Sequence, residues 1–274
     1  MNLILFFRSK GLIGFLAVFG LVLGGIWISS VQAEETTPVT RKGTYSTQHG
    51  GSGTFQQTVN KQRGSRTGQT TWQNANGGQG VHNSNNTYNA QSGTGTHQAN
   101  TTYANGQSTS SQGTWQRTSP GNGTYKGTFT QRNGQVDQVN ETVQKESNGS
   151  YQVDSSVTNP NGKTVTNDKT ITPTSNGYTT QGTATGPNGK STTYDNNTVF
   201  TKNANGTYSR NMTGSATGPN GNTSTYNDGA TYTQNADGSY TRNAGGTVTG
   251  PNGQSQNFGN TETYTQTPSP DSGW

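Results

Sequence analysis

Aromatic residues alternate with Thr, Ser and Asn along the second half of the chain. Between residues 194 and 264 every aromatic residue is even-numbered, whereas the odd positions carry mainly Thr, Ser and Asn. A period of two is typical of β-strands, because successive side chains point to opposite faces. The pattern therefore predicts strands with one aromatic and one Thr-rich face, and eight residues are expected to share the aromatic face: Tyr194, Phe200, Tyr208, Tyr226, Tyr232, Tyr240, Phe258 and Tyr264.

A repeated turn motif separates these strands. TGPNG ends at Gly189, Gly221 and Gly253, 32 residues apart, and the related NANG and NADG end at Gly206 and Gly238. Pro or Ala suits the second position of a type I turn, Asn or Asp the third, and Gly the left-handed conformation that follows. Each motif thus predicts a three-residue hairpin loop that ends in a turn glycine.

Such loops also predict the strand register. A three-residue loop pairs residues whose numbers sum to an even value, so one parity stays on one face through successive hairpins. Cross-strand aromatic and opposite-charge pairs contribute about 0.2–1 kcal/mol each. The expected partners are Tyr208 with Tyr232, Tyr240 with Tyr264, Arg242 with Glu262, Gly214 with Tyr226, and Gly246 with Phe258.

The expected fold is all-β, an elongated antiparallel meander of repeated hairpins that forms a single-layer or curled sheet. The alternative is a β-solenoid, whose rungs also give fixed periods. We favour the meander because these turns reverse the chain locally, whereas solenoid corners pass it to the next rung.

The first 33 residues are typical of an export signal. Arg8 and Lys10 precede an apolar run from Gly11 to Ile28, and VQA follows. This order predicts a signal peptide cleaved after Ala33, with an uncleaved membrane anchor as the alternative. Both interpretations place the remainder outside the cytoplasm. We then expect a linker at 34–42, irregular Gly/Thr/Gln-rich strands at 43–121, the regular hairpin-repeat sheet at 122–265 and a disordered tail at 266–274.

The composition of the exported part limits how it can fold and what it can bind. It has no Leu, no Cys, one Ile and one Met, so it cannot bury a core of ordinary size and depends on backbone hydrogen bonds. Fifteen Lys and Arg stand against twelve Asp and Glu, a net charge of +3. This weak and dispersed excess does not predict a nucleic-acid partner.

No sequence motif indicates catalysis or metal binding. His49, His82 and His97 do not have the spacing of metal ligands, although His82 and His97 could lie on adjacent strands. The acidic residues are isolated, and no serine lies in a GxSxG motif. We therefore expect no enzyme, no cofactor and no metal site.

The GPNG hairpins and the Gly-Thr-aromatic triplets, such as Gly113-Thr114-Trp115, resemble those of secreted bacterial proteins rich in Gly, Thr and Asn. The resemblance covers most of the chain after residue 33. It implies an exported repeat protein and carries no activity with it.

The leading hypothesis is an exported, non-enzymatic structural protein of a bacterial cell surface or matrix. Self-assembly through open strand edges is a subsidiary hypothesis. The first alternative is a wall or capsule polysaccharide-binding module that stacks sugars on the aromatic face. The second is an ice-binding surface formed by the Thr-rich face. The expected partners are therefore other copies of the chain or an envelope polysaccharide.

Overall fold

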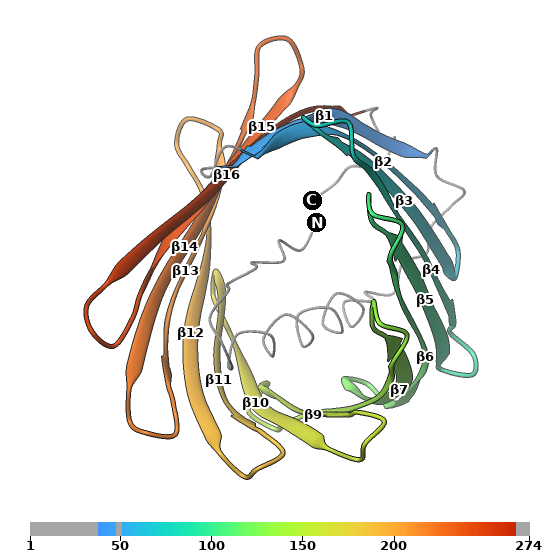
Figure 1. Ribbon diagram of the computed structural model, residues 1–274, viewed down its shortest axis with the longest axis vertical. Coiled ribbons are helices and arrows are strands. Elements are labelled where there is room, and N and C mark those ends of the chain that lie inside the picture. The colour runs from blue at the N-terminus through green and yellow to red at the C-terminus, as the bar shows by residue number, and fades with distance from the viewer. Residues whose placement is uncertain (1–37, 48–50, 267–274) are drawn as a thin grey trace. The chain divides into compact units, whose positions relative to one another are not determined.

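The structure, a computed structural model, describes residues 38–47 and 51–266. These residues contain no helix and form a meander of sixteen antiparallel strands, in which β1 pairs with β16 to close a barrel (Figure 1). The expected signal peptide, His49 and residues 267–274 of the expected tail lie outside the described residues. The strands are β1 (Val39–Thr47), β2 (Ser52–Gln62), β3 (Ser65–Asn74), β4 (Gln79–Asn89), β5 (Thr94–Thr102), β6 (Ser108–Ser119), β7 (Asn122–Thr130), β8 (Val136–Lys145), β9 (Tyr151–Thr158), β10 (Thr164–Thr174), β11 (Gly177–Thr185), β12 (Ser191–Lys202), β13 (Tyr208–Thr217), β14 (Thr223–Gln234), β15 (Tyr240–Thr249) and β16 (Ser255–Gln266).

The predicted all-β antiparallel meander is confirmed, and its closure is an additional finding. Each strand pairs with its neighbours in the sequence, so the alternative of a β-solenoid is wrong for the described residues. The seam joins residues 41–47 of β1 to residues 260–266 of β16. Among the described residues, no strand therefore has an unpaired edge.

The predicted turn geometry is confirmed at each of the motifs. In the first TGPNG copy, Gly186 N donates to Lys190 O and Gly189 N donates to Gly186 O, both at 2.9 Å. Gly189 has a φ of +74°, which is the left-handed conformation that closes the three-residue loop. The other four predicted turn glycines have φ values between 75° and 81°: Gly206, Gly221, Gly238 and Gly253.

The predicted register is also confirmed. Strands β13 to β16 pair in the order that the three-residue loops require. The observed partners are Tyr208 with Tyr232, Gly214 with Tyr226, Tyr240 with Tyr264, Arg242 with Glu262, and Gly246 with Phe258.

The strands before residue 122 are as regular as those after it. β1 to β6 belong to the same sheet, and β1 begins at Val39, inside the stretch expected to be a linker. One exception is a register shift between Arg117 and Ser119, at the end of β6. The whole described part of the chain is therefore built from one kind of unit, the β-hairpin.

The barrel wall has two chemically different faces. Following the register from strand to strand puts every aromatic residue of the strands on one face, and every buried strand residue lies on that same face. Side chains on the concave side of a closed wall converge and shield each other, whereas those on the convex side spread apart. The aromatic face is therefore the inner face, and the Thr-, Ser-, Asn- and Gln-rich face is the outer face.

Candidate functional site: the two faces of the barrel wall

The eight predicted aromatic residues all lie on the inner face. They are spread over the five strands β12 to β16, and they do not gather in a pocket. Tyr240 and Tyr264 stack with ring centroids 5.7 Å apart and an interplanar angle of 18°. Phe200 and Tyr208 remain 50% and 41% exposed. The aromatic face is thus a lining of separate ring contacts along the wall.

Three of the eight rings, those of Tyr194, Tyr226 and Phe258, lie over a glycine of the neighbouring strand. A Cβ atom built on Gly182 would lie 2.5 Å from Tyr194 Oη, so the ring occupies the space above the bare backbone. The Tyr194 hydroxyl reaches across β11 and donates to Asn167 Oδ1 at 2.7 Å. The Tyr226 ring lies over Gly214 in the same way, and its hydroxyl donates to Asp195 O of β12 at 3.1 Å. These two tyrosines therefore each tie together three consecutive strands.

Sequence reasoning missed the corresponding rings of the N-terminal strands. Trp72 lies over Gly80, and Tyr88 stacks on Trp115 with centroids 4.9 Å apart and an interplanar angle of 10°. The Gly-Thr-aromatic triplets were the available signal, because residues two apart on a strand share a face. In Gly113-Thr114-Trp115, for example, the glycine and the ring are inside and the threonine is outside.

A chain of charges crosses the inner face of β13 to β16. Arg210 forms a salt bridge with Asp228, and Arg242 Nη1 lies 3.5 Å from Glu262 Oε1. Arg242 Nη1 also donates to Asn260 Oδ1 at 3.3 Å. Burial raises the pKa of Asp228, while the two arginines act in the opposite direction. These charges neutralise each other within the wall.

A second charged group, formed by Glu141 and Lys169, is more deeply buried. The two residues are 3% and 5% exposed. Ser155 Oγ donates to Glu141 Oε2 at 3.2 Å, and Glu141 Oε1 has no hydrogen-bond partner among the described residues. Burial raises the pKa of Glu141 and lowers the pKa of Lys169, and the opposite charge of each partner counters both shifts. Glu141 lies outside both surface depressions, the one between β9 and β13 and the one formed by β1, β15 and β16.

Histidines His82 and His97 lie on neighbouring strands of the inner face, where each is hydrogen-bonded. His82 Nδ1 lies 2.8 Å from Thr101 Oγ1, and His97 Nδ1 lies 2.8 Å from Asn86 Oδ1. Burial lowers the pKa of both rings, and His82 lowers that of His97 further. Within the described ranges no three His, Asp, Glu or Cys side chains come together in a way that would hold a metal ion.

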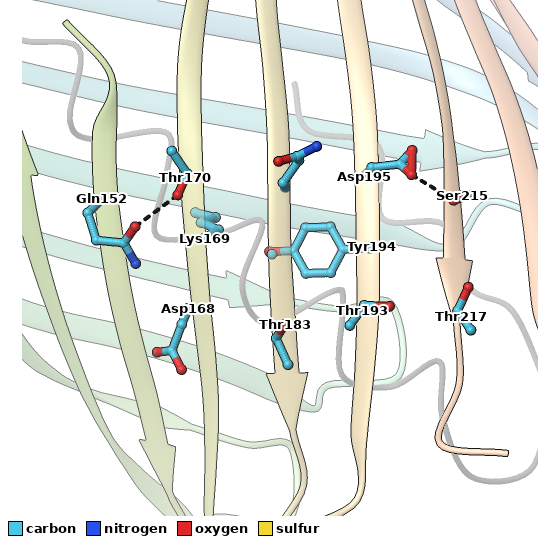
Figure 2. Close-up of a pocket in the computed structure, with 12 residues that line it drawn as sticks. Gln152, Asp168, Lys169, Thr170, Thr183, Thr193, Tyr194, Asp195, Ser215 and Thr217 are labelled. Carbon is cyan, nitrogen blue, oxygen red and sulfur yellow. Dashed lines mark hydrogen bonds between the residues drawn. The ribbon is translucent and has the colours of Figure 1, made fainter. Parts of the chain in front are cut away.

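A polar depression of about 420 Å³ lies on the outer face between β9 and β13 (Figure 2). Its hydrogen bonds run between neighbouring strands: Thr170 donates to Gln152 Oε1 at 2.9 Å, and Ser215 donates to Asp195 Oδ2 at 2.8 Å. Asp168 lies directly opposite Asp154. Partial desolvation and then the charge of Asp154 raise the pKa of Asp168. The depression thus offers hydroxyl, amide and carboxylate groups on an open surface.

The part of the chain that the structure describes contains no helix long and apolar enough to cross a membrane. No protein-family model, curated protein or solved structure matches the chain. The two faces of the wall are therefore the features that bear on function.

Proposed function

We propose that the protein is an exported, non-enzymatic structural barrel of a bacterial cell surface or extracellular matrix. The observation that carries the proposal is the use of the inner rings as packing elements. Tyr194, Tyr226 and Phe258 each cover a glycine of the adjacent strand. Rings engaged in this way stabilise the wall itself, which is the role expected of a structural protein.

The outer face supports the same proposal. Its hydroxyl groups pair across the strands, as Thr217 with Thr223 and Thr249 with Ser255 do, both at 2.8 Å. Thr247 likewise donates to Asn257 at 2.7 Å. A surface of paired hydroxyl and amide groups is well hydrated and adds lateral ties between strands. It therefore suits a protein that displays a polar surface to its surroundings.

Self-association needs a different route from the open edges expected of a flat sheet. β1 and β16 pair with each other, so edge-to-edge assembly requires the seam to open first. Polysaccharide binding through the aromatic residues would likewise take place on the inner face of the barrel.

The proposal is tested by locating the protein in bacteria that express the full chain with a C-terminal tag. We expect the tag in the surface or culture fraction, and on intact cells we expect an antibody to reach it. A tag confined to the cytoplasmic fraction would contradict the exported role. Hydrolysis of a polysaccharide by the purified protein would contradict the non-enzymatic role.

A further inference from the structure

Basic and acidic residues are segregated around the barrel. Residues 38–132 contain eight Lys and Arg and no Asp or Glu, whereas residues 133–266 contain seven Lys and Arg and nine Asp and Glu. The first range covers β1 to β7, which are consecutive in the wall. One side of the barrel is therefore purely basic, although the net charge of the whole chain is small.

The densest group of cations is at the hairpin between β2 and β3. Lys61 lies directly opposite Arg66, and Arg63 lies in the two-residue loop that joins the strands. All three residues are exposed. Like charges directly opposite each other on a strand pair repel, and an anion bound at this hairpin would offset that repulsion.

The loop is held in place against β4. Gly64 has a φ of +74°, and Tyr88 N donates to Gly64 O at 2.6 Å. This bond places the backbone of Tyr88 beside the basic loop. Tyr88 in turn stacks on Trp115 of β6. The basic loop and the stacked rings therefore occupy one end of the same wall segment.

Arg117 extends the group on β6. It follows Trp115 by two positions, so both side chains belong to the inner face. Its amide N donates to Gly93 O at 2.7 Å, and its side chain is exposed. Within the described residues Arg63, Arg66 and Arg117 form no salt bridge. We call Lys61, Arg63, Arg66, Tyr88, Trp115 and Arg117 the basic-aromatic cluster.

We propose that the basic-aromatic cluster binds an anionic polysaccharide, a partner that the structural role alone does not require. Carboxylate, sulfate or phosphate groups of the polymer contact the arginines and Lys61, because guanidinium groups bind such anions in a bidentate manner. A sugar ring lies against the Tyr88–Trp115 stack.

A polysaccharide fits this cluster better than a nucleic acid. Proteins that depend on phosphate contacts for tight DNA binding make roughly six to ten of them, and the cluster has four cations. The expected export signal also places the protein where such polymers occur.

The test measures binding of the purified mature chain to alginate, a polyuronate, with dextran as a neutral polymer and a single-stranded oligonucleotide as the other polyanion. We expect alginate binding at about 50 mM NaCl that weakens at about 300 mM, since salt screens exposed charges. The triple variant K61Q/R63Q/R66Q is expected to bind at least about tenfold more weakly. Trp115→Phe should retain most of the binding, whereas Trp115→Ala should lose much of it.

The matched control is K126Q/K163Q/K190Q, which removes the same charge from exposed lysines elsewhere. It should bind within about twofold of the wild type, because its lysines lie outside the cluster. Far-UV circular dichroism checks that every variant is folded, and the triple variant alters only exposed side chains. Four results would overturn the proposal: no alginate binding, an equal loss in the control, dextran binding as tight as alginate binding, or tighter binding of the oligonucleotide. None of them changes where the protein is found in cells, so this test and that of the structural role fail separately.

Discussion

Replacing Gly214 by Ala tests whether the rings over glycines hold the barrel wall together. A Cβ atom at this position would lie 2.5 Å from both Cζ and Oη of Tyr226, and it would overlap the carbonyl oxygen of Asp195. The Tyr226 hydroxyl donates to that same oxygen at 3.1 Å. The methyl group therefore forces the ring away from the wall and breaks its hydrogen bond.

The size of the effect follows from three contributions. Re-exposing roughly 60 Å² of the ring costs about 1.5 kcal/mol at about 25 cal/mol per Å². Loss of the hydrogen bond costs about 1 kcal/mol. Alanine offsets about 0.5–1 kcal/mol, because glycine is less favourable within a strand. The net destabilisation of about 2 kcal/mol corresponds to a melting temperature lower by roughly 4–8 °C for a chain of this size.

The assay is thermal unfolding followed by circular dichroism, with Gly218→Ala as the control. Gly218 follows the same strand, and a Cβ there would meet nothing closer than Asn222 O at 3.7 Å. We expect the control to melt within about 2 °C of the wild type, as surface substitutions usually do. In a Tyr226→Ala background, Gly214→Ala should lose the part of its effect that comes from the ring and keep the part that comes from the Asp195 carbonyl oxygen. If Gly214→Ala and Gly218→Ala melt at the same temperature, the ring contacts are not what stabilises the wall.

Three further predictions concern the turns, the seam and the histidines. Gly221→Ala should lower the free energy of unfolding by about 1–2 kcal/mol, because Gly221 has a φ of +77°. No atom lies within 4 Å of its Cβ position, so the cost comes from the backbone conformation. Gly221→Asn should cost less, and equal melting temperatures of these two variants would contradict the prediction. Ser46 and Thr261 are paired across the seam. In the double variant S46C/T261C, oxidation should therefore form an intramolecular disulfide that raises the melting temperature. Formation of disulfide-linked dimers alone would argue against closure of the barrel. The pKa values of His82 and His97 are lowered in the folded protein, so folding favours their neutral rings. The stability that the neutral rings contribute is complete above pH 6.5, the pKa of a histidine in the unfolded chain, and is lost as the pH falls below that value. Between pH 7 and pH 5 the melting temperature of the wild type should therefore fall more than that of the H82Q/H97Q variant. An equal fall in both proteins would refute the prediction that these two histidines destabilise the folded state when they are protonated.

The part of the wall from β12 to β16 was predictable because its loops all have the same length. Three-residue loops preserve parity, so the even numbers of Tyr208, Tyr232 and Tyr240 identified one face without any structure. The same rule gave the pairing of Arg242 with Glu262, which the structure confirms. Turn chemistry and a period of two are local signals, and both are complete within a single hairpin.

The register and the faces of the N-terminal strands could not be predicted in this way, because the loops between them vary in length. The two-residue loop at Arg63 and Gly64 and the four-residue loop between Asn89 and Thr94 each change the parity of the inner face. A third change occurs at Ser175 and Asn176. A rule of fixed parity therefore made these strands look irregular, although their rings and glycines alternate as regularly as those of β12 to β16.

Closure and the basic-aromatic cluster could not be predicted from local signals. The pairing of β1 with β16 joins residues more than 200 positions apart, and no motif in either strand specifies it. The net charge of +3 likewise hid the fact that residues 38–132 carry no acidic side chain. Only the order of strands around the wall brings Arg117 to the same end as Arg66.

A barrel of sixteen strands has an interior that a single layer of side chains cannot fill, since about eight strands already give the width that wall side chains occupy. A wall without Leu or Cys meets this condition through contacts between neighbouring strands. Trp72 over Gly80 and Tyr194 over Gly182 are contacts within the sheet, and they need no partner from the opposite wall. It follows that the inner glycines and rings are constrained as pairs, while outer Thr and Asn residues are free to vary at little cost. A new binding surface can therefore also arise on the inner face, at exposed positions that carry neither a ring nor the glycine beneath it, and Lys61 and Arg66 are such positions.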